Sequence, residues 1–116
     1  MKNQEEYQNI AQEFANLALE KYGDRVDTII LFGSAARGEA REDSDIDILV
    51  VGDVTLDELL DVSIPLLLQH GKHISAQDME KSRFKRLVEQ GYSFINNVLD
   101  DGVVLFERTG KTSGKI

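Results

Sequence analysis

Four residues in the first half of the sequence combine the chemical groups needed to hold a metal-bound nucleotide. Gly33 and Ser34 follow one apolar run, and Asp45 and Asp47 alternate with isoleucine at the start of a second one. Glycine lets the backbone approach a ligand without a side chain in the way. A serine that opens a helical turn can offer its N–H group and hydroxyl to phosphate oxygens. The pattern therefore predicts a phosphate-binding turn next to a pair of carboxylates.

The two aspartates predict a metal ion. Residues two apart on a strand point to the same face and lie about 7 Å apart, so Asp45 and Asp47 would share a face. Carboxylates this close repel each other unless a cation lies between them. Mg²⁺ is typically held by one or two carboxylates, while substrate phosphates and water fill its remaining positions. We therefore expect Mg²⁺ here; the alternative is an exposed strand end with two solvated acids.

Arg37 follows the glycine-serine turn closely enough to serve the same ligand. Its guanidinium is planar and permanently charged, so it could add a bidentate contact to the phosphates. The alternative for Arg37 is a surface salt bridge to one of three nearby acids, Glu39, Glu42 or Asp43. The alternative for Gly33 and Ser34 is an ordinary turn.

The apolar pattern also predicts the elements that would position these residues. Helical spacing predicts helices over residues 4–22, 78–90 and 92–100, and a further helix that Thr55 would cap and that runs to residue 67. Short apolar runs predict strands over residues 26–32, 45–51, 73–77 and 103–106. Pro65 is expected to kink or split the helix that contains it. Ser34 would open a short helical turn directly after the first strand.

Length and composition indicate one globular domain and exclude several classes of protein. The 116 residues fit a domain over 1–108 and a disordered tail over 109–116. The net charge of −8 disfavours tight binding to nucleic acid, which rests on Lys and Arg. The absence of cysteine excludes disulfides and thiolate metal sites. No run approaches the roughly 20 apolar residues that span a bilayer, so we expect no membrane contact and a cytoplasmic location.

The motifs resemble those of a known superfamily. Leu31-Phe32-Gly33-Ser34-Ala35-Ala36-Arg37-Gly38 is followed by Ser44-Asp45-Ile46-Asp47. The sequence resembles the nucleotidyltransferase superfamily typified by DNA polymerase β, and within it the minimal nucleotidyltransferases. The resemblance implies an α+β domain, with a small mixed β-sheet flanked by helices in the nucleotidyltransferase fold.

The resemblance also implies a reaction and the residues that carry it. In that family the glycine-serine turn holds nucleotide phosphates and two aspartates bind Mg²⁺, which here are Gly33, Ser34, Asp45 and Asp47. We add Ser44, which precedes the first aspartate, to the nucleotide-binding residues. The implied activity transfers an NMP, with AMP favoured, from a nucleoside triphosphate to an acceptor hydroxyl, and pyrophosphate leaves.

The sequence departs from the family pattern at one position. Active members generally supply a third metal-binding carboxylate from a later strand, but the corresponding segment here reads Ile74-Ser75-Ala76. Asp78 lies three residues further on, so strand alternation turns it away from Ser75, although a bulge or strand end could bring it round. The alternative to an active enzyme is therefore a catalytically weak or inactive module that binds a nucleotide or a partner.

The resemblance implies a partner as well. Minimal nucleotidyltransferases often occur with a small helical protein of the HEPN type, in pairs that behave as toxin and antitoxin. A chain of this length has no room for a separate acceptor-binding domain, so we expect the acceptor to be recognised by the cleft itself, by a homodimer or by such a partner. His70 and His73 are interpreted as surface residues. The basic cluster is interpreted as a solvated helix face; it comprises Lys81, Arg83, Lys85 and Arg86.

Overall fold

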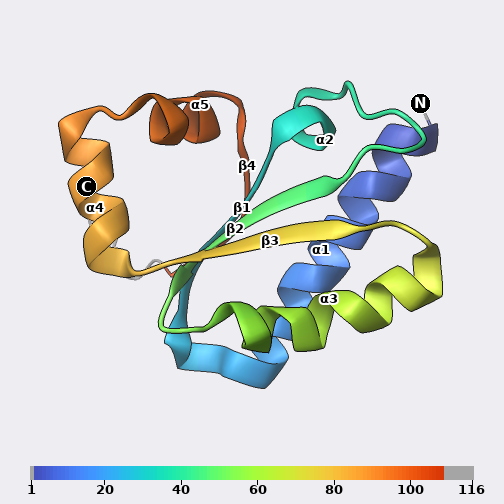
Figure 1. Cartoon of the computed structure of the whole chain (residues 1–116), viewed down its shortest axis with the longest axis horizontal. Coiled ribbons are helices and arrows are strands. Elements are labelled where there is room, and N and C mark those ends of the chain that lie inside the picture. Colours follow the sequence, from blue (N-terminus) through green and yellow to red (C-terminus); the bar gives the residue numbers. More distant parts are fainter. Residues whose placement is uncertain (1, 109–116) are drawn as a thin grey trace.

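The computed structural model describes residues 2–108, which form one mixed sheet with helices on both of its faces (Figure 1). The elements, in chain order, are α1 (Lys2–Tyr22), the 3₁₀ helix η1 (Gly23–Arg25), β1 (Val26–Phe32), α2 (Gly33–Arg37), β2 (Ile46–Gly52), α3 (Leu56–His70), β3 (Ile74–Met79), α4 (Lys81–Gln90), α5 (Ser93–Asp101) and β4 (Val103–Glu107). The expected α+β class is confirmed. The expected tail over 109–116 lies outside the described residues.

The sheet has the strand order β3-β2-β1-β4. Strand β1 is antiparallel to both β2 and β4, whereas β2 and β3 are parallel. Parallel neighbours need a crossover connection, which α3 supplies. The register sets Phe32 of β1 opposite Asp47 of β2, and it sets Asp47 opposite Ser75 of β3.

Both central strands are buried on both faces, which explains why their sequences are nearly continuous apolar runs. On one face, α1 and α3 cover a large cluster that includes Phe14, Leu31, Ile48 and Leu59. On the other face, α4 and α5 cover a smaller cluster; its fully buried members are Ile30, Leu49, Val51 and Val98. Figure 1 shows these two helical layers on opposite sides of the sheet.

Two local expectations differ from the structure. Strand β3 continues to Met79, so α4 begins at Lys81 and not at residue 78. Helix α3 is not split at Pro65 but is one helix from Leu56 to His70. Pro65 lies on the exposed side of that helix, where water can satisfy the carbonyl that loses its partner. No helix in residues 2–108 combines the length and apolarity needed to cross a membrane.

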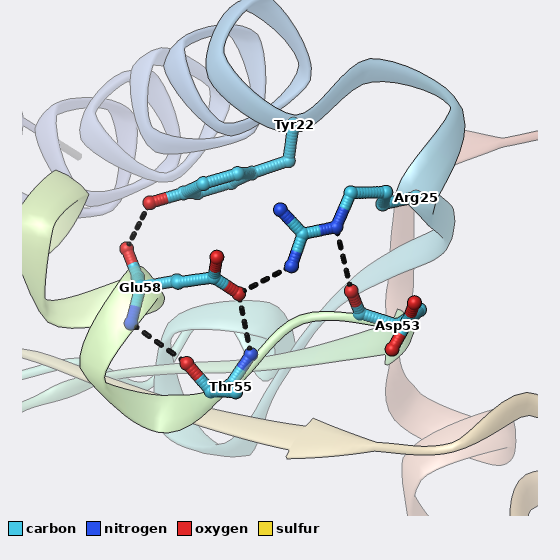
Figure 2. Close-up of polar contacts among 5 residues, drawn as sticks. All are labelled: Tyr22, Arg25, Asp53, Thr55 and Glu58. Atoms are coloured by element: carbon cyan, nitrogen blue, oxygen red, sulfur yellow. Dashed lines mark hydrogen bonds and ion pairs between the residues drawn. The ribbon is translucent and has the colours of Figure 1, made fainter.

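A polar network joins the end of α1 to the start of α3 (Figure 2). Thr55 and Glu58 form a capping box, in which each side chain accepts a hydrogen bond from the other residue's backbone N–H. Arg25 donates to the Glu58 carboxylate at 2.6 Å and to the Asp53 carbonyl at 3.0 Å. The Tyr22 hydroxyl donates to the Glu58 carbonyl at 2.8 Å. These contacts fix α3 against the chain that leads into β1.

We expect Glu58→Gln to lower the melting temperature by a few degrees at pH 7. The hydrogen bond from Arg25 lowers the pKa of the Glu58 carboxyl, and the Thr55 N–H lowers it further. Because the folded-state pKa is lowered, the stabilisation is present above the unfolded-state pKa and is lost as pH falls through the folded-state pKa. Thermal melts from pH 7 to pH 3 should show the two proteins converging. Asp57→Asn, an exposed acid in the same helical turn, is the control; an equal loss there would contradict a specific role for Glu58.

Candidate active site

The antiparallel pairing of β1 and β2 brings the two predicted motifs to one end of the sheet. Gly33 and Ser34 begin α2 directly after β1 ends. Asp45 directly precedes β2, Asp47 is the second residue of that strand, and Phe32 pairs with Asp47. The structure therefore places the glycine-serine turn beside the carboxylates.

Gly33 touches the Asp47 carboxylate so closely that no side chain fits between them. A Cβ atom added at Gly33 would lie 2.3 Å from Asp47 Oδ2, and the φ angle of +75° already favours glycine. The residue before α2, Phe32, offers no side-chain cap to the helix. The first N–H groups of α2 are therefore able to donate to a ligand.

The two aspartates differ in their surroundings. The Asp45 side chain is exposed, whereas Asp47 is half-buried. Burial raises the pKa of the Asp47 carboxyl and the charge of Asp45 raises it further, while Arg37 and His73 oppose these effects. A bound cation would offset this unfavourable negative charge.

The donor set fits a divalent cation that arrives with its nucleotide. Two carboxylates on one face of a strand end supply oxygen ligands, which Mg²⁺ prefers. Within residues 2–108, no three acidic or histidine side chains form a ready-made metal cage. Phosphate oxygens and water would therefore be needed to complete the coordination of a cation.

Arg37 and Ser44 both make local contacts. Arg37 Nε donates to Glu39 Oε1 at 3.0 Å, so the surface salt bridge weighed from the sequence is present. An exposed pair of this kind is weak, which leaves the guanidinium able to turn to a phosphate. The Ser44 hydroxyl accepts a hydrogen bond from the Arg41 N–H at 2.8 Å and so closes the turn before Asp45.

Helix α1 holds the loop between α2 and β2. The Tyr7 hydroxyl, on a fully buried side chain, donates to the backbone carbonyls of Arg41 and Glu42. Gln4 Nε2 donates to the Ala40 carbonyl at 2.8 Å. The sequence predicted the helix that contains Tyr7 but not these contacts, because apolar spacing gives no sign of where a hydroxyl finds its acceptor.

The third carboxylate is absent from the place where the family pattern expects it. Ser75 pairs with Asp47, and paired residues on neighbouring strands point to the same face. Asp78 pairs with Val50, on the opposite face of the sheet and about 10 Å further along the strand. The alternative that Asp78 supplies the third ligand is therefore wrong: β3 stays regular through Met79, so no bulge or strand end turns Asp78 round.

The two histidines contact different acidic residues. His70 contacts Glu13 at 3.0 Å. His73, however, lies at the candidate site, with Nδ1 3.3 Å from Asp45 Oδ1. Sequence reasoning missed this contact because it depends on the parallel register of β2 and β3.

The candidate site lies at one end of the two central strands. A hollow of about 580 Å³ lies instead at the opposite end of the sheet and is lined by residues that include Arg25, Asp53, Lys81 and Arg108. The predicted basic face on α4 borders that hollow through Lys81, which contacts Asp27 at 3.6 Å. None of the residues that line this hollow belongs to the glycine-serine turn or to the pair of aspartates.

Two comparisons by sequence identify proteins that are similar to this chain. A family model described as "Polymerase beta, Nucleotidyltransferase" matches residues 8–111. A candidate protein adenylyltransferase of Methanocaldococcus jannaschii is 45% identical over 95 residues, which cover 82% of this chain and 93% of that protein.

Two solved structures share the fold at low sequence identity. A candidate nucleotidyltransferase from Sulfolobus solfataricus superposes with a TM-score of 0.61 at 19% identity, over 93% of this chain and 86% of that chain. The second structure is described as a tri-AMPylated Shewanella oneidensis HEPN toxin in complex with MNT antitoxin. A chain of that complex superposes on this protein with a TM-score of 0.50 at 16% identity, over 89% of this chain and 75% of the chain from the complex.

Gly33→Ala should destabilise the protein more than Gly38→Ala. The two glycines have φ angles of +75° and +76°, so the backbone strain is matched, but only Gly33 faces Asp47. Overpacking typically costs about 1–3 kcal/mol, and we expect a difference near the low end, about 1 kcal/mol, in thermal or chemical unfolding, because the Asp47 side chain can move to admit the methyl group. Asp47→Ala should close most of that gap. Equal losses in the two variants would show that the contact with Asp47 does not restrict residue 33.

Asp47→Asn should raise the melting temperature of the metal-free protein at pH 7. The raised pKa of Asp47 means that its ionised form destabilises the fold. This penalty is complete above the folded-state pKa and disappears as pH falls through that pKa toward the unfolded-state value, so the gain should shrink in acid. Melts in EDTA test this, with Asp43→Asn, an exposed acid in the preceding loop, as the control for net charge. A lower melting temperature for Asp47→Asn would contradict the expectation.

Proposed function

The chain belongs to the polymerase beta nucleotidyltransferase family, and on that premise we propose that it transfers AMP from ATP to a hydroxyl group of another protein. The main support for a protein acceptor is the 45% identity to a candidate protein adenylyltransferase, 93% of whose length is matched. The support within the chain is the contact of the Gly33 turn with the carboxylate of Asp47.

The residues of the site have distinct roles in this proposal. Asp45 and Asp47 hold a divalent cation, with Mg²⁺ the expected ion. Gly33 lets the backbone approach the triphosphate, and Ser34 donates to its oxygens from the start of α2. When bound, the cation offsets charge on the α-phosphate and the leaving group and acidifies the attacking hydroxyl.

The transfer itself needs little covalent chemistry from the protein. The acceptor oxygen forms a bond to the α-phosphorus while the bond from that phosphorus to the β-phosphate bridging oxygen breaks, and pyrophosphate leaves. The hydroxyl proton passes to solvent. The side chains act mainly by holding the triphosphate in line with the acceptor. Arg37, once turned from Glu39, would add a fixed positive charge beside the phosphates.

The acceptor in this proposal is a small helical protein of the HEPN type. The Asp45 side chain is exposed, which leaves room for a side chain of another protein to reach the α-phosphate. The fold is shared with an MNT antitoxin whose HEPN partner carries AMP groups. In this proposal a partner or a second copy of the chain would position the hydroxyl.

One observation favours a second candidate function. Ser75 occupies the position opposite Asp47 where the family pattern expects the third carboxylate. With less negative charge to hold the cation that activates the acceptor, catalysis would weaken. The second candidate is therefore a module that binds Mg-nucleotide or a partner with little turnover.

Thermal melting with nucleotides separates these functions from a purely structural role. The protein is melted with ATP, GTP, CTP or UTP, each with and without Mg²⁺. A ligand at a hundredfold excess over its Kd stabilises by about 2.7 kcal/mol. We expect a Mg²⁺-dependent shift, largest for ATP, that is lost in the Asp45→Asn/Asp47→Asn double variant and kept in Asp78→Asn, whose acid lies on the opposite sheet face.

Isotope transfer then separates the enzyme from the binding module. Protein is incubated with a purified HEPN-type protein and ATP labelled at either the α- or the γ-phosphate. Label from the α-position alone on the HEPN-type protein would support adenylyl transfer. A nucleotide shift without transfer would favour the binding module, and no shift with any nucleotide would contradict both.

A further inference from the structure

His73 places a ring nitrogen beside the candidate metal site. Its Nδ1 atom lies 3.3 Å from Asp45 Oδ1. The Ile46 N–H donates to the His73 carbonyl at 2.9 Å, so the pairing of β2 and β3 extends one step beyond the regular ladder. That step fixes the backbone of residue 73 next to the residue that carries the first carboxylate.

The register explains why the side chains meet. Ile46 pairs with Ile74 and Asp47 pairs with Ser75 in the parallel ladder. One step back along both strands sets His73 beside Asp45. Because alternate residues share a face, His73 and Ser75 lie on the face that carries the two aspartates. His73, which directly precedes β3, therefore offers an imidazole nitrogen on the face where Ser75 offers no carboxylate.

We propose that His73 binds the metal ion through Nδ1 and takes the place of the missing third carboxylate. This inference rests on the proposed function, because it needs a cation between Asp45 and the nucleotide. It assigns to His73 a role that no acid in β3 can fill, since Asp78 lies on the other face.

The distance between the two side chains suits two ligands of one metal. Metal–nitrogen and metal–oxygen bonds of about 2.1 Å place neighbouring ligand atoms at right angles about 3 Å apart. The 3.3 Å between His73 Nδ1 and Asp45 Oδ1 is close to this value. As a simple ion pair the contact would contribute little, because both side chains are more than half exposed, at 59% and 55%.

A nitrogen ligand changes which metal the site prefers. Mg²⁺ favours oxygen ligands, whereas imidazole suits transition metals. With two carboxylates, one imidazole and phosphate oxygens, the site should bind Mn²⁺ more tightly than Mg²⁺. The preference should depend on His73 and not on His70, whose ring nitrogen contacts Glu13 of α1 instead.

Pulsed EPR with Mn²⁺ tests the ligand directly. The full chain is labelled with ¹⁵N-histidine and mixed with Mn²⁺ and a non-transferable ATP analogue with a methylene group between the α- and β-phosphorus atoms. The chain has only two histidines, so ¹⁵N coupling to bound Mn²⁺ must come from His70 or His73. We expect the coupling in the unaltered protein and in His70→Gln, and its loss in His73→Gln.

Metal affinity gives a second readout that does not depend on activity. Titrations with the same analogue should show about a tenfold weaker Mn²⁺ affinity in His73→Gln, the low end of losses seen when a metal ligand's support is removed, with Mg²⁺ affinity nearly unchanged. His73→Asp should restore an oxygen ligand and shift the preference toward Mg²⁺. A cooperative thermal unfolding transition of each metal-free variant would show that the variant is folded.

The outcomes separate this inference from the proposed function. Bound Mn²⁺ with no histidine coupling, and equal Mn²⁺ affinity in His73→Gln, would overturn the role of His73 while leaving the nucleotide site intact. Coupling that survives in His73→Gln would overturn it as well. Failure of Mn²⁺ and Mg²⁺ alike to bind with the nucleotide would overturn both proposals.

Discussion

The close contact between Gly33 and the Asp47 carboxylate is the constraint on which the site depends. It exists because β1 and β2 are antiparallel and in a register that sets Phe32 opposite Asp47. The chain leaves β1 at Gly33 with a φ angle of +75°, and the missing side chain lets the start of α2 lie against the carboxylate. The turn predicted to bind phosphate and the carboxylate predicted to bind a cation thus become neighbours through backbone pairing.

The surrounding structure holds this arrangement against an unfavourable interaction. Asp47 is half-buried and faces Asp45, so its ionised form is disfavoured and its pKa is raised. Apolar burial on both faces of β1 and β2 supplies the compensating stability. Tyr7 and Gln4 tie the connecting loop to α1, which limits how far Asp45 can move from Asp47. The unfavourable ionisation of Asp47 is confined to the candidate site, as expected where function and stability compete.

Local features of the sequence predicted most elements, whereas long-range pairing decided the details of the site. The apolar runs, Gly33 and the cap at Thr55 each act within a few residues, so they could be recognised directly. The pairing of Ser75 with Asp47, the orientation of Asp78 and the contact of His73 with Asp45 depend on which strand lies beside β2 and in which register. That choice follows from how α3 crosses over the sheet, which no short pattern contains. The start of α4 was misplaced for a related reason, since pairing with β2 keeps Asp78 and Met79 in the strand.

The openness of the site bears on when the proposed transfer would occur. Electrostatic stabilisation of a reacting phosphate is stronger where water is excluded. Asp45 and His73 are each more than half exposed, so in the proposed function the chain alone would leave a bound cation and the α-phosphate in contact with solvent. An acceptor protein that covers these residues would exclude water and deliver its hydroxyl in the same step. On this reasoning, transfer to water would be slow without the proposed partner, which would contribute to catalysis as well as being modified.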